Sequence, residues 1–324
     1  LDKFYDKFTA DLAIISSPIQ FHLPQIKVAV SNGSNVLCEK PLTATVADAK
    51  EILRLEEEAD KFVGIGYQWS FSEAILDLKN DILKGVLGSP KRLKTIILWP
   101  RNKNYFNRSS WAGRIKDDKG RWVLDSVANN ATAHYLHNMF FVLGNSINES
   151  IRPQSVTAKL YRANDIENYD TAAVRVITEN EVELLYLASH AIKERLDPSF
   201  KFEFEKATVY FGDYEEDSNN IVAKFKDGRV KNYGDPFQNT FNKLWMAIDA
   251  VKEDENTLPC TSRTAFSHTL CINKMQQNNI ADFPEAIINY DEDDNLLWVE
   301  ELSDIFRDCY SNWELFSENK LVEK

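Results

Sequence analysis

The sequence lacks the features that mark several functional classes. It contains no apolar run of membrane-spanning length, so no transmembrane segment is predicted. Its 38 basic residues are outnumbered by 50 acidic ones, and the net charge of −12 argues against nucleic-acid binding, which needs a basic face. The four cysteines are scattered without a C-x-x-C pair, which fits reduced thiols better than a disulfide framework or a zinc site. We therefore expect a cytoplasmic protein with no membrane or nucleic-acid partner.

Short apolar runs alternate with helical patterns in the first part of the chain. The 324 residues, 44% of them hydrophobic, suffice for one large or two medium domains. Strands are predicted at residues 11–16, 35–38 and 62–67, with helices at 25–31 and 45–61. Thr45 and Asp48 resemble a capping box at the start of the second helix. The β-α-β-α-β order predicts parallel strands, as in half of a doubly wound (Rossmann) nucleotide-binding sheet.

Glycine is scarce, with 11 residues, and none of them forms a G-x-G-x-x-G turn. The nearest pattern, Gly64-Ile65-Gly66, lies inside a predicted strand. In a complete doubly wound domain the glycine-rich turn follows the first strand, and here it would precede Leu1. Either the record is truncated or the chain has no such phosphate site. We favour the first reading and expect the sequence to be N-terminally incomplete.

The character of the sequence changes after Gly88-Ser89-Pro90. Alternating apolar residues predict strands near residues 92–99, 156–160, 174–176, 182–186, 202–204, 209–211 and 221–225, and Asp227-Gly228 is a hairpin signal. Helical patterns follow at residues 241–251, 265–275 and 302–316. Because several strands follow one another without helices between them, we expect an α+β domain with a large mixed or antiparallel sheet and helices on one face.

Two domains are therefore expected. Residues 1–87 would be the remainder of a dinucleotide-binding Rossmann domain, and residues 88–324 an α+β domain for substrate binding and oligomerisation. Exposed sheet faces in the second domain favour a homo-oligomer.

The first candidate for chemistry is the stretch Val36-Leu-Cys-Glu39-Lys40-Pro41. Because proline ends the strand, Glu39 and Lys40 should stand at the carboxyl end of a buried strand. In an open α/β sheet that edge binds ligands. A lysine beside a carboxylate could orient or protonate a substrate oxygen. The alternative is a surface ion pair at a strand end.

The second candidate is a turn and helix between Trp122 and Asn138. Helical spacing places Asn130, His134 and His137 on one polar stripe beside an apolar face. Imidazole suits proton transfer near neutral pH. One alternative is a buried helix with satisfied polar groups. Another is a metal site completed by Asp125, but the spacing is not H-E-x-x-H, and no metal is expected.

Four short motifs carry a resemblance to a known family. Ser17-Pro18 followed by His22 is similar to a T-P-N-x-x-H segment, and Glu39-Lys40-Pro41 matches an E-K-P signature. Gly66-Tyr67-Gln68 resembles a strand end beside the nicotinamide, and Asn130-Ala-Thr-Ala-His134 stands where D-x-x-x-H is usual. In these motifs the chain resembles the glucose–fructose oxidoreductase / inositol dehydrogenase (Gfo/Idh/MocA) family of NAD(P)-dependent oxidoreductases.

The resemblance implies NAD or NADP as cofactor and a role for each matching residue. Lys40 and His134 would share the acid/base work at the substrate hydroxyl, with Asn130 beside them. The residues implied to line the cofactor are Ser16, Ser17, Pro18, His22, Glu39, Lys40 and Gln68. The residues expected to contact substrate are Tyr67, Trp111, Arg114, Asp125 and His137, although Trp111 and Arg114 fit a plain surface loop equally well.

Two departures from the family pattern affect the site. Asn130 replaces the usual aspartate, so either Asp125 supplies the missing charge or the site is tuned differently. Ile19 replaces the usual asparagine, which removes one cofactor hydrogen bond.

The leading hypothesis is an NAD(P)-dependent dehydrogenase or reductase that acts on a small sugar, inositol or related polyol. An NAD-dependent glycosidase of the same fold and a non-catalytic dinucleotide-binding regulator are the alternatives.

Overall fold

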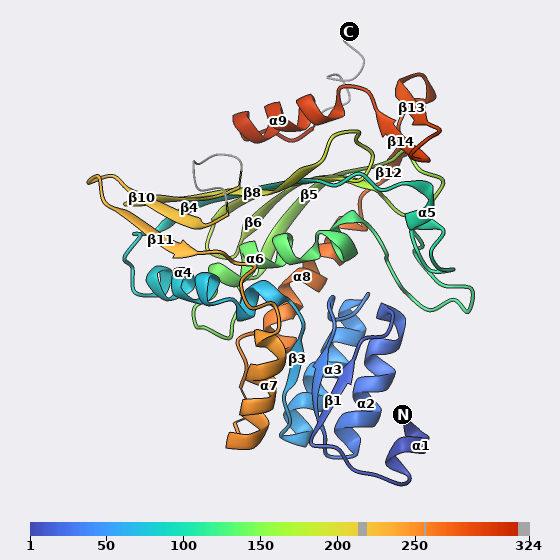
Figure 1. The fold of residues 1–324 in the computed structure, drawn as a ribbon, viewed down its shortest axis with the longest axis vertical. Coiled ribbons are helices and arrows are strands. Elements are labelled where there is room, and N and C mark those ends of the chain that lie inside the picture. The colour runs from blue at the N-terminus through green and yellow to red at the C-terminus, as the bar shows by residue number, and fades with distance from the viewer. Residues whose placement is uncertain (213–218, 256, 317–324) are drawn as a thin grey trace.

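The N-terminal part of the chain forms a small parallel sheet covered by helices (Figure 1). The computed structural model describes residues 1–212, 219–255 and 257–316. The strands β1 (Leu12–Ile15), β2 (Asn35–Cys38) and β3 (Val63–Ile65) pair in parallel in that order. Between and before them lie α1 (Asp2–Tyr5), η1 (Ile19–Phe21), α2 (His22–Ser31) and α3 (Val46–Ala59). The predicted β-α-β-α-β unit with parallel strands is confirmed.

Local sequence signals set the ends of these elements. The Thr45 side chain caps α3 by accepting a hydrogen bond from the Asp48 amide at 3.1 Å. Gly33, with φ of +83°, follows α2 in the left-handed region that glycine adopts at little cost. All four residues of β2 are buried, because helices cover both of its faces.

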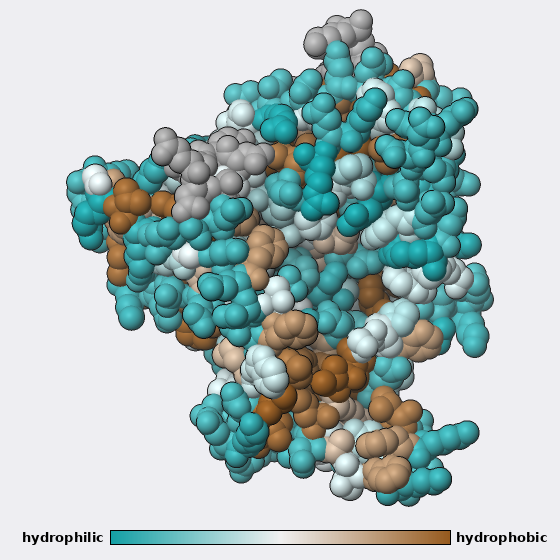
Figure 2. Space-filling model, viewed as in Figure 1, coloured by the Kyte–Doolittle hydropathy of each residue, from teal (hydrophilic) through white to brown (hydrophobic). Residues whose placement is uncertain are grey.

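Residues from the C-terminal half complete the core of this small sheet. The helix α7 (Asn242–Glu253) packs against β1 and β2, and Ala247 and Ala250 are buried there. The Ile65 amide donates to the Cys260 carbonyl at 2.9 Å, which extends the sheet past β3. Coverage is incomplete at the other edge, where Ile14 of β1 is 61% exposed. Figure 2 shows brown apolar side chains gathered over this lower part of the molecule.

The second sheet is large and mixed. Its order is β11-β10-β9-β8-β4-β7-β6-β5-β12, with β4 parallel to β7, β12 parallel to β5 and the other neighbours antiparallel. Its strands are β4 (Pro90–Leu98), β5 (Pro153–Arg162), β6 (Thr171–Thr178), β7 (Glu183–Ser189), β8 (Leu196–Phe204), β9 (Ala207–Phe211), β10 (Ile221–Phe225), β11 (Val230–Gly234) and β12 (Ile280–Asp282). The predicted mixed sheet is confirmed.

Helices cover both faces of this sheet, so the prediction of helices on one face only is wrong. The helices α4 (Glu73–Leu83), α6 (Ala133–Val142) and α8 (Ser262–Met275) lie on one face, and α9 (Leu302–Asn312) lies on the other (Figure 1). The cause is visible in β7, which alternates between Tyr186 on the first face and Leu185 on the second. Both faces are apolar, and the buried stripe of α9 packs on the second.

The remaining elements lie around the large sheet. They are η2 (Gln68–Phe71), α5 (Lys103–Phe106), the π-helical turn η3 (Val127–Ala131), η4 (Glu285–Ile287) and the hairpin of β13 (Ile288–Asp291) and β14 (Leu296–Val299). Among the helices that the structure describes, none is both long and apolar enough to cross a bilayer.

Candidate active site

The carboxyl ends of the three parallel strands meet the start of α6, and Lys40 lies at that junction. Its ammonium donates to the main-chain oxygen of Asn130 at 2.5 Å, and the side-chain oxygen of Asn130 lies 3.3 Å away. The preceding residue, Glu39, binds the Lys243 ammonium of α7 in an ion pair. The turn after β2 is thereby tied both to α7 and to η3.

The charge state of Lys40 suits proton transfer. Burial is the main cause that lowers the pKa of Lys40, to about 8, and the Glu39 and Asp125 carboxylates oppose it. The positive charges of Lys243 and Arg108 lower this pKa further. An amine with a pKa near 8 populates both its neutral and its charged form around neutral pH, as a general acid or base must.

Asp125 stands directly behind Asn130. Its Oδ1 accepts a hydrogen bond from the Asn130 side-chain amide at 2.7 Å, and its Oδ2 accepts one from the Gly113 amide at 2.6 Å. Arg108 adds an ion pair at 3.7 Å. Burial raises the pKa of Asp125, and the hydrogen bond from Gly113 and the Arg108 charge oppose the shift. A carboxylate is therefore present beside position 130, although it is one hydrogen bond further from Lys40.

His134 lies one helical turn after Asn130, on α6. Burial holds the pKa of His134 well below its usual range, and the nearby charges of Lys40 and Lys243 add to the effect. The ring is therefore neutral. Its buried Nδ1 has no hydrogen-bond partner among the described residues. A buried ring nitrogen without a partner is uncommon in folded proteins.

A second layer of aromatic and histidine rings supports His134. The Tyr67 ring meets the His134 ring edge-on, with centroids 5.7 Å apart, and the Tyr67 hydroxyl lies 2.9 Å from Nδ1 of His268. The other ring nitrogen of His268 lies 3.1 Å from the Ala128 carbonyl. Since a carbonyl only accepts, that nitrogen carries the proton and Tyr67 donates to Nδ1. Burial lowers the pKa of His268 to about 4, so this ring too is neutral.

The structure corrects the direct substrate contacts expected of Tyr67 and His137. Their exposed fractions are 0% and 1%. The His137 ring stacks on Tyr67 at 3.9 Å, and its Nε2 lies 3.0 Å from the Ser70 hydroxyl. The three-residue step from His134 to His137 turns the second ring away from the strand ends and into the core. Tyr67 meets the His134 ring, and His137 stacks on Tyr67.

His268, which the sequence places on a late helix in a structural rather than a catalytic role, supports Tyr67. It stands on the inward face of α8 in line with Ala265 and Ile272, at helical spacing. A histidine among apolar positions was the available signal, but only the fold shows that it meets Tyr67.

Several residues expected to line the cofactor lie at the carboxyl edge of the small sheet and are at least partly exposed. Ser16 is exposed, and Pro18 and Gln68 are half-buried, at the carboxyl edge of the sheet. The Ser17 hydroxyl donates to the Gln25 side chain at 2.6 Å.

His22 is buried and links two turns through contacts with main-chain carbonyls. The expectation that it lines the cofactor is therefore corrected. Its Nδ1 lies 2.9 Å from the Pro41 carbonyl and its Nε2 lies 2.9 Å from the Ser17 carbonyl. The ring fixes the turn after β1 against the turn after β2, and its polar atoms face the main chain.

Two residues of the loop before α6, Trp111 and Arg114, contact other side chains of the protein. Arg114 pairs with Glu167 at 2.9 Å and is nearly half exposed, as the surface-loop alternative has it, and its expected contact with substrate stays a prediction. Trp111 is half-buried and lies beneath the Arg108 guanidinium, 4.9 Å from ring centroid to Cζ. Among the described residues, no group of three or more His, Cys, Asp or Glu side chains could hold a metal ion.

Parts of the chain are similar in sequence to known oxidoreductases. Residues 1–67 match the family model GFO_IDH_MocA, described as the oxidoreductase family with an NAD-binding Rossmann fold. Inositol 2-dehydrogenase 1 of Saccharopolyspora erythraea is 30% identical over 128 residues, which is 38% of this chain and 38% of that protein. D-xylose 1-dehydrogenase [NADP(+)] of Haloarcula marismortui is 29% identical over 92 residues, 28% of this chain and 26% of that protein. The matched segments thus span less than two fifths of these relatives.

Solved structures share the fold over most of the chain. The WlbA dehydrogenase of Bordetella pertussis, solved with NADH and UDP-GlcNAcA, superposes with a TM-score of 0.67 at 17% identity, covering 86% of this chain and 79% of that one. Levoglucosan dehydrogenase in complex with NADH gives a TM-score of 0.67 at 14% identity, covering 82% and 77%. The resemblance of this chain to the Gfo/Idh/MocA family of oxidoreductases is therefore confirmed, with residues 1–67 matching its NAD-binding Rossmann fold.

Proposed function

We propose that this protein is an NAD(P)-dependent oxidoreductase that transfers a hydride between nicotinamide and a carbinol carbon of a sugar, inositol or related polyol. The observation that carries the proposal is the bond from the Lys40 ammonium to the Asn130 carbonyl, one helical turn before His134. Enzymes that oxidise an alcohol need a base at the hydroxyl and an ordered partner for its oxygen. Lys40 and His134 supply one group of each kind.

The residues at the sheet edge fit the nicotinamide end of a dinucleotide. Ser16 is exposed and Gln68 half-buried at the carboxyl ends of parallel strands, where doubly wound sheets bind nucleotides. The unpartnered Nδ1 of His134 is a polar group that a bound alcohol would satisfy. We propose that Ser16, Ser17, Pro18, Glu39, Lys40 and Gln68 hold the cofactor. A nicotinamide held there supplies the acceptor or donor of the hydride.

The chain's own residues handle the proton. Neutral Lys40 takes the hydroxyl proton of the alcohol during oxidation, and the ammonium returns a proton to the carbonyl oxygen during reduction. Neutral His134 orients the same oxygen. Asp125 acts indirectly. It accepts a hydrogen bond from the Asn130 side chain and opposes the lowering of the Lys40 pKa.

The organisation of the molecule belongs to the same proposal. We assign cofactor binding to residues 1–87, completed by α7 and the segment around Cys260, and substrate binding to residues 88–324. A cytoplasmic location is supported by the scattered spacing of the four cysteines, without a C-x-x-C pair, which fits reduced thiols. We also propose a homo-oligomer, which light scattering on the purified protein measures directly.

Two measurements in sequence test the function. Fluorescence titration with NADH and NADPH comes first, and a turnover screen on inositols, pentoses, hexoses and sugar alcohols follows. Saturable binding together with reduction of NAD(P)⁺ by a polyol is the expected result. Absence of dinucleotide binding overturns the proposal. Binding without turnover on any member of the screen favours the regulator, and release of nitrophenol from nitrophenyl glycosides without net NADH favours the glycosidase.

A further inference from the structure

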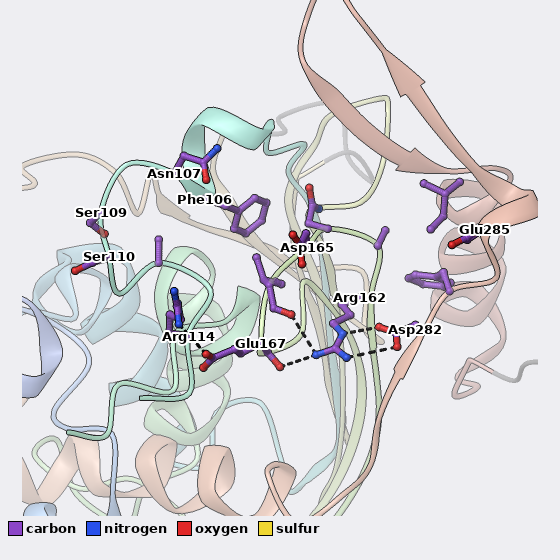
Figure 3. A pocket seen from close by; sticks show the side chains of 16 residues that line it. Phe106, Asn107, Ser109, Ser110, Arg114, Arg162, Asp165, Glu167, Asp282 and Glu285 are labelled. Atoms are coloured by element: carbon purple, nitrogen blue, oxygen red, sulfur yellow. Dashed lines mark hydrogen bonds and ion pairs between the residues drawn. The ribbon is translucent and has the colours of Figure 1, made fainter. Parts of the chain in front are cut away.

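A cavity of about 890 Å³, which Lys40 does not line, lies beside the loop that precedes α6 (Figure 3). Three segments enclose it: residues 106–114, residues 162–167 at the end of β5, and residues 282–288. Its volume is in the range of roughly 300–1,000 Å³ typical of small-molecule pockets. We propose that this cavity binds a sugar ring that carries no anionic group.

One backbone segment separates the cavity from the network behind Lys40. The Gly113 amide donates to Asp125 on one side at 2.6 Å. The Gly113 carbonyl accepts from the amides of Glu167 and Asn168 on the other, at 3.0 and 2.9 Å. Gly113 has φ of +69°, and an added Cβ would lie 2.6 Å from Cγ2 of Ile166. This close approach, which only glycine allows, forms the wall between the two sites.

One residue that lines the cavity carries a buried acceptor without a donor. Asn164, only 5% exposed, lines the cavity, and its side-chain amide nitrogen donates to Asp170 at 2.8 Å. Because a carboxylate can only accept, the orientation of the Asn164 amide is determined, and its Oδ1 faces away from Asp170. That oxygen has no partner among the described residues, and neither does the buried hydroxyl oxygen of Ser109. A ligand that donates hydrogen bonds, as sugar hydroxyls do, would satisfy both.

The charges around the cavity disfavour anions. Both lining guanidiniums are already occupied: Arg114 pairs with Glu167 at 2.9 Å and Arg162 with Asp282 at 2.5 Å. Figure 3 shows these pairs pointing toward one another. The carboxylates of Asp165 and Glu285 also line the cavity, and the described residues form no ion pair with them. Four carboxylates against two paired guanidiniums repel phosphates and uronates, and accept hydroxyl or ammonium donors.

The cavity also offers apolar surface for the carbon skeleton of a sugar. The rings of Phe106 and Phe283 and the side chain of Ile288 line it. Sugar-binding sites need both features, because a pyranose presents C–H faces and hydroxyl edges. The ring bound here could belong to the far end of an oligosaccharide or glycoside substrate, or to a separate sugar. The chemistry of recognition is the same for both.

Direct binding to the full chain tests the proposal without any turnover, so it can fail independently of the proposed function. The probes for isothermal titration are methyl β-glucoside, cellobiose, glucosamine, glucuronate and glucose 6-phosphate. Methyl glucoside, cellobiose and glucosamine should bind at least about tenfold more tightly than the two anions, a difference that like-charge rejection readily produces. Equal binding of neutral and anionic sugars, or no sugar binding at all, overturns the proposal.

Variants of the lining residues test whether the sugar binds in this cavity. Ser110 is exposed at the rim, and Ser110→Trp should abolish one equivalent of sugar binding while leaving NADH binding and the thermal unfolding midpoint unchanged. Asp165→Asn with Glu285→Gln should bring glucose 6-phosphate binding to within about threefold of methyl glucoside by removing the repulsion. Glu292→Gln, on the exposed turn after β13, is the matched control and should change neither. Unaltered sugar binding in Ser110→Trp rejects the cavity as the site.

The stoichiometry of sugar binding shows whether the bound ring is the far end of a longer substrate or a separate sugar. If the cavity holds the far end of a longer substrate, cellobiose binds one to one and at least about tenfold more tightly than methyl glucoside. If it holds a separate sugar, cellobiose binds no more tightly than methyl glucoside. Methyl glucoside then binds with one additional equivalent, which Ser110→Trp removes. Both patterns support a sugar site in this cavity.

Discussion

The Lys40 ammonium donates to the main-chain oxygen of Asn130, which lies 90 positions later in the sequence and 2.5 Å away in space. The bond joins the end of β2 to the π-helical turn that opens α6. Since the acceptor is a main-chain atom, it does not depend on the side chain at position 130. This explains how asparagine can stand where the related motif has aspartate: the carboxylate sits at Asp125, and the Asn130 side chain connects the two.

The first prediction concerns Asp125→Asn. The Asp125 carboxylate opposes the lowering of the Lys40 pKa, so its removal should shift that pKa from about 8 to a lower value. Because oxidation requires neutral Lys40, the rising limb of kcat/KM against pH should move to lower pH in this variant. The measurement is a pH–rate profile from pH 6 to 10. Asp118→Asn, at an exposed loop position, is the control and should leave the midpoint in place. A midpoint that moves upward in Asp125→Asn contradicts the assignment.

The second prediction concerns Tyr67→Phe. Loss of the hydroxyl leaves Nδ1 of His268 without its donor and loosens the ring that meets His134. We expect kcat to fall by about tenfold, as for a slightly misplaced catalytic group, with the Kd for NADH unchanged. The control is Tyr290→Phe, which removes a hydroxyl from the exposed bond to Asn295. If KM and the NADH Kd rise while kcat stays constant, Tyr67 has no positioning role.

The third prediction compares two glycines with similar backbone angles. Gly113 and Gly120 have φ of +69° and +76°, but an added Cβ meets Ile166 at 2.6 Å at the first position and open space at the second. Both alanine variants share the backbone strain, and only Gly113→Ala adds a clash. Its Tm should be lower than that of Gly120→Ala by at least about 3 °C. Equal Tm values in calorimetry would show that the loop is not clamped at Gly113.

The sequence predicts local features of this fold well. Caps, apolar runs and alternation are local signals, so the strands and helices around Thr45, Gly33 and β2 follow from them. The convergence of Lys40 and Asn130 follows from topology, because one ends a parallel strand and the other opens the next domain's helix.

Side-chain directions were beyond the sequence pattern. Whether His137 faces the strand ends or the core depends on a rotation of one helical step, which packing against Tyr67 decides. Arg114 turns to Glu167 because the loop is held between Asp125 and residues 166–168. His268 meets Tyr67 across 201 positions of sequence, a contact that no local pattern encodes.

The most direct test of the account is the turnover of Lys40→Ala on a polyol accepted by the wild-type protein, with NADH affinity measured in parallel. We predict that kcat falls by about 10²-fold or more, as for loss of a general acid or base, that this factor exceeds any rise in the NADH Kd, and that added ethylamine restores part of the rate. Lys50→Ala, on the exposed side of α3, should behave as wild type. A kcat for Lys40→Ala within about threefold of wild type would remove Lys40 from the chemistry and contradict the account.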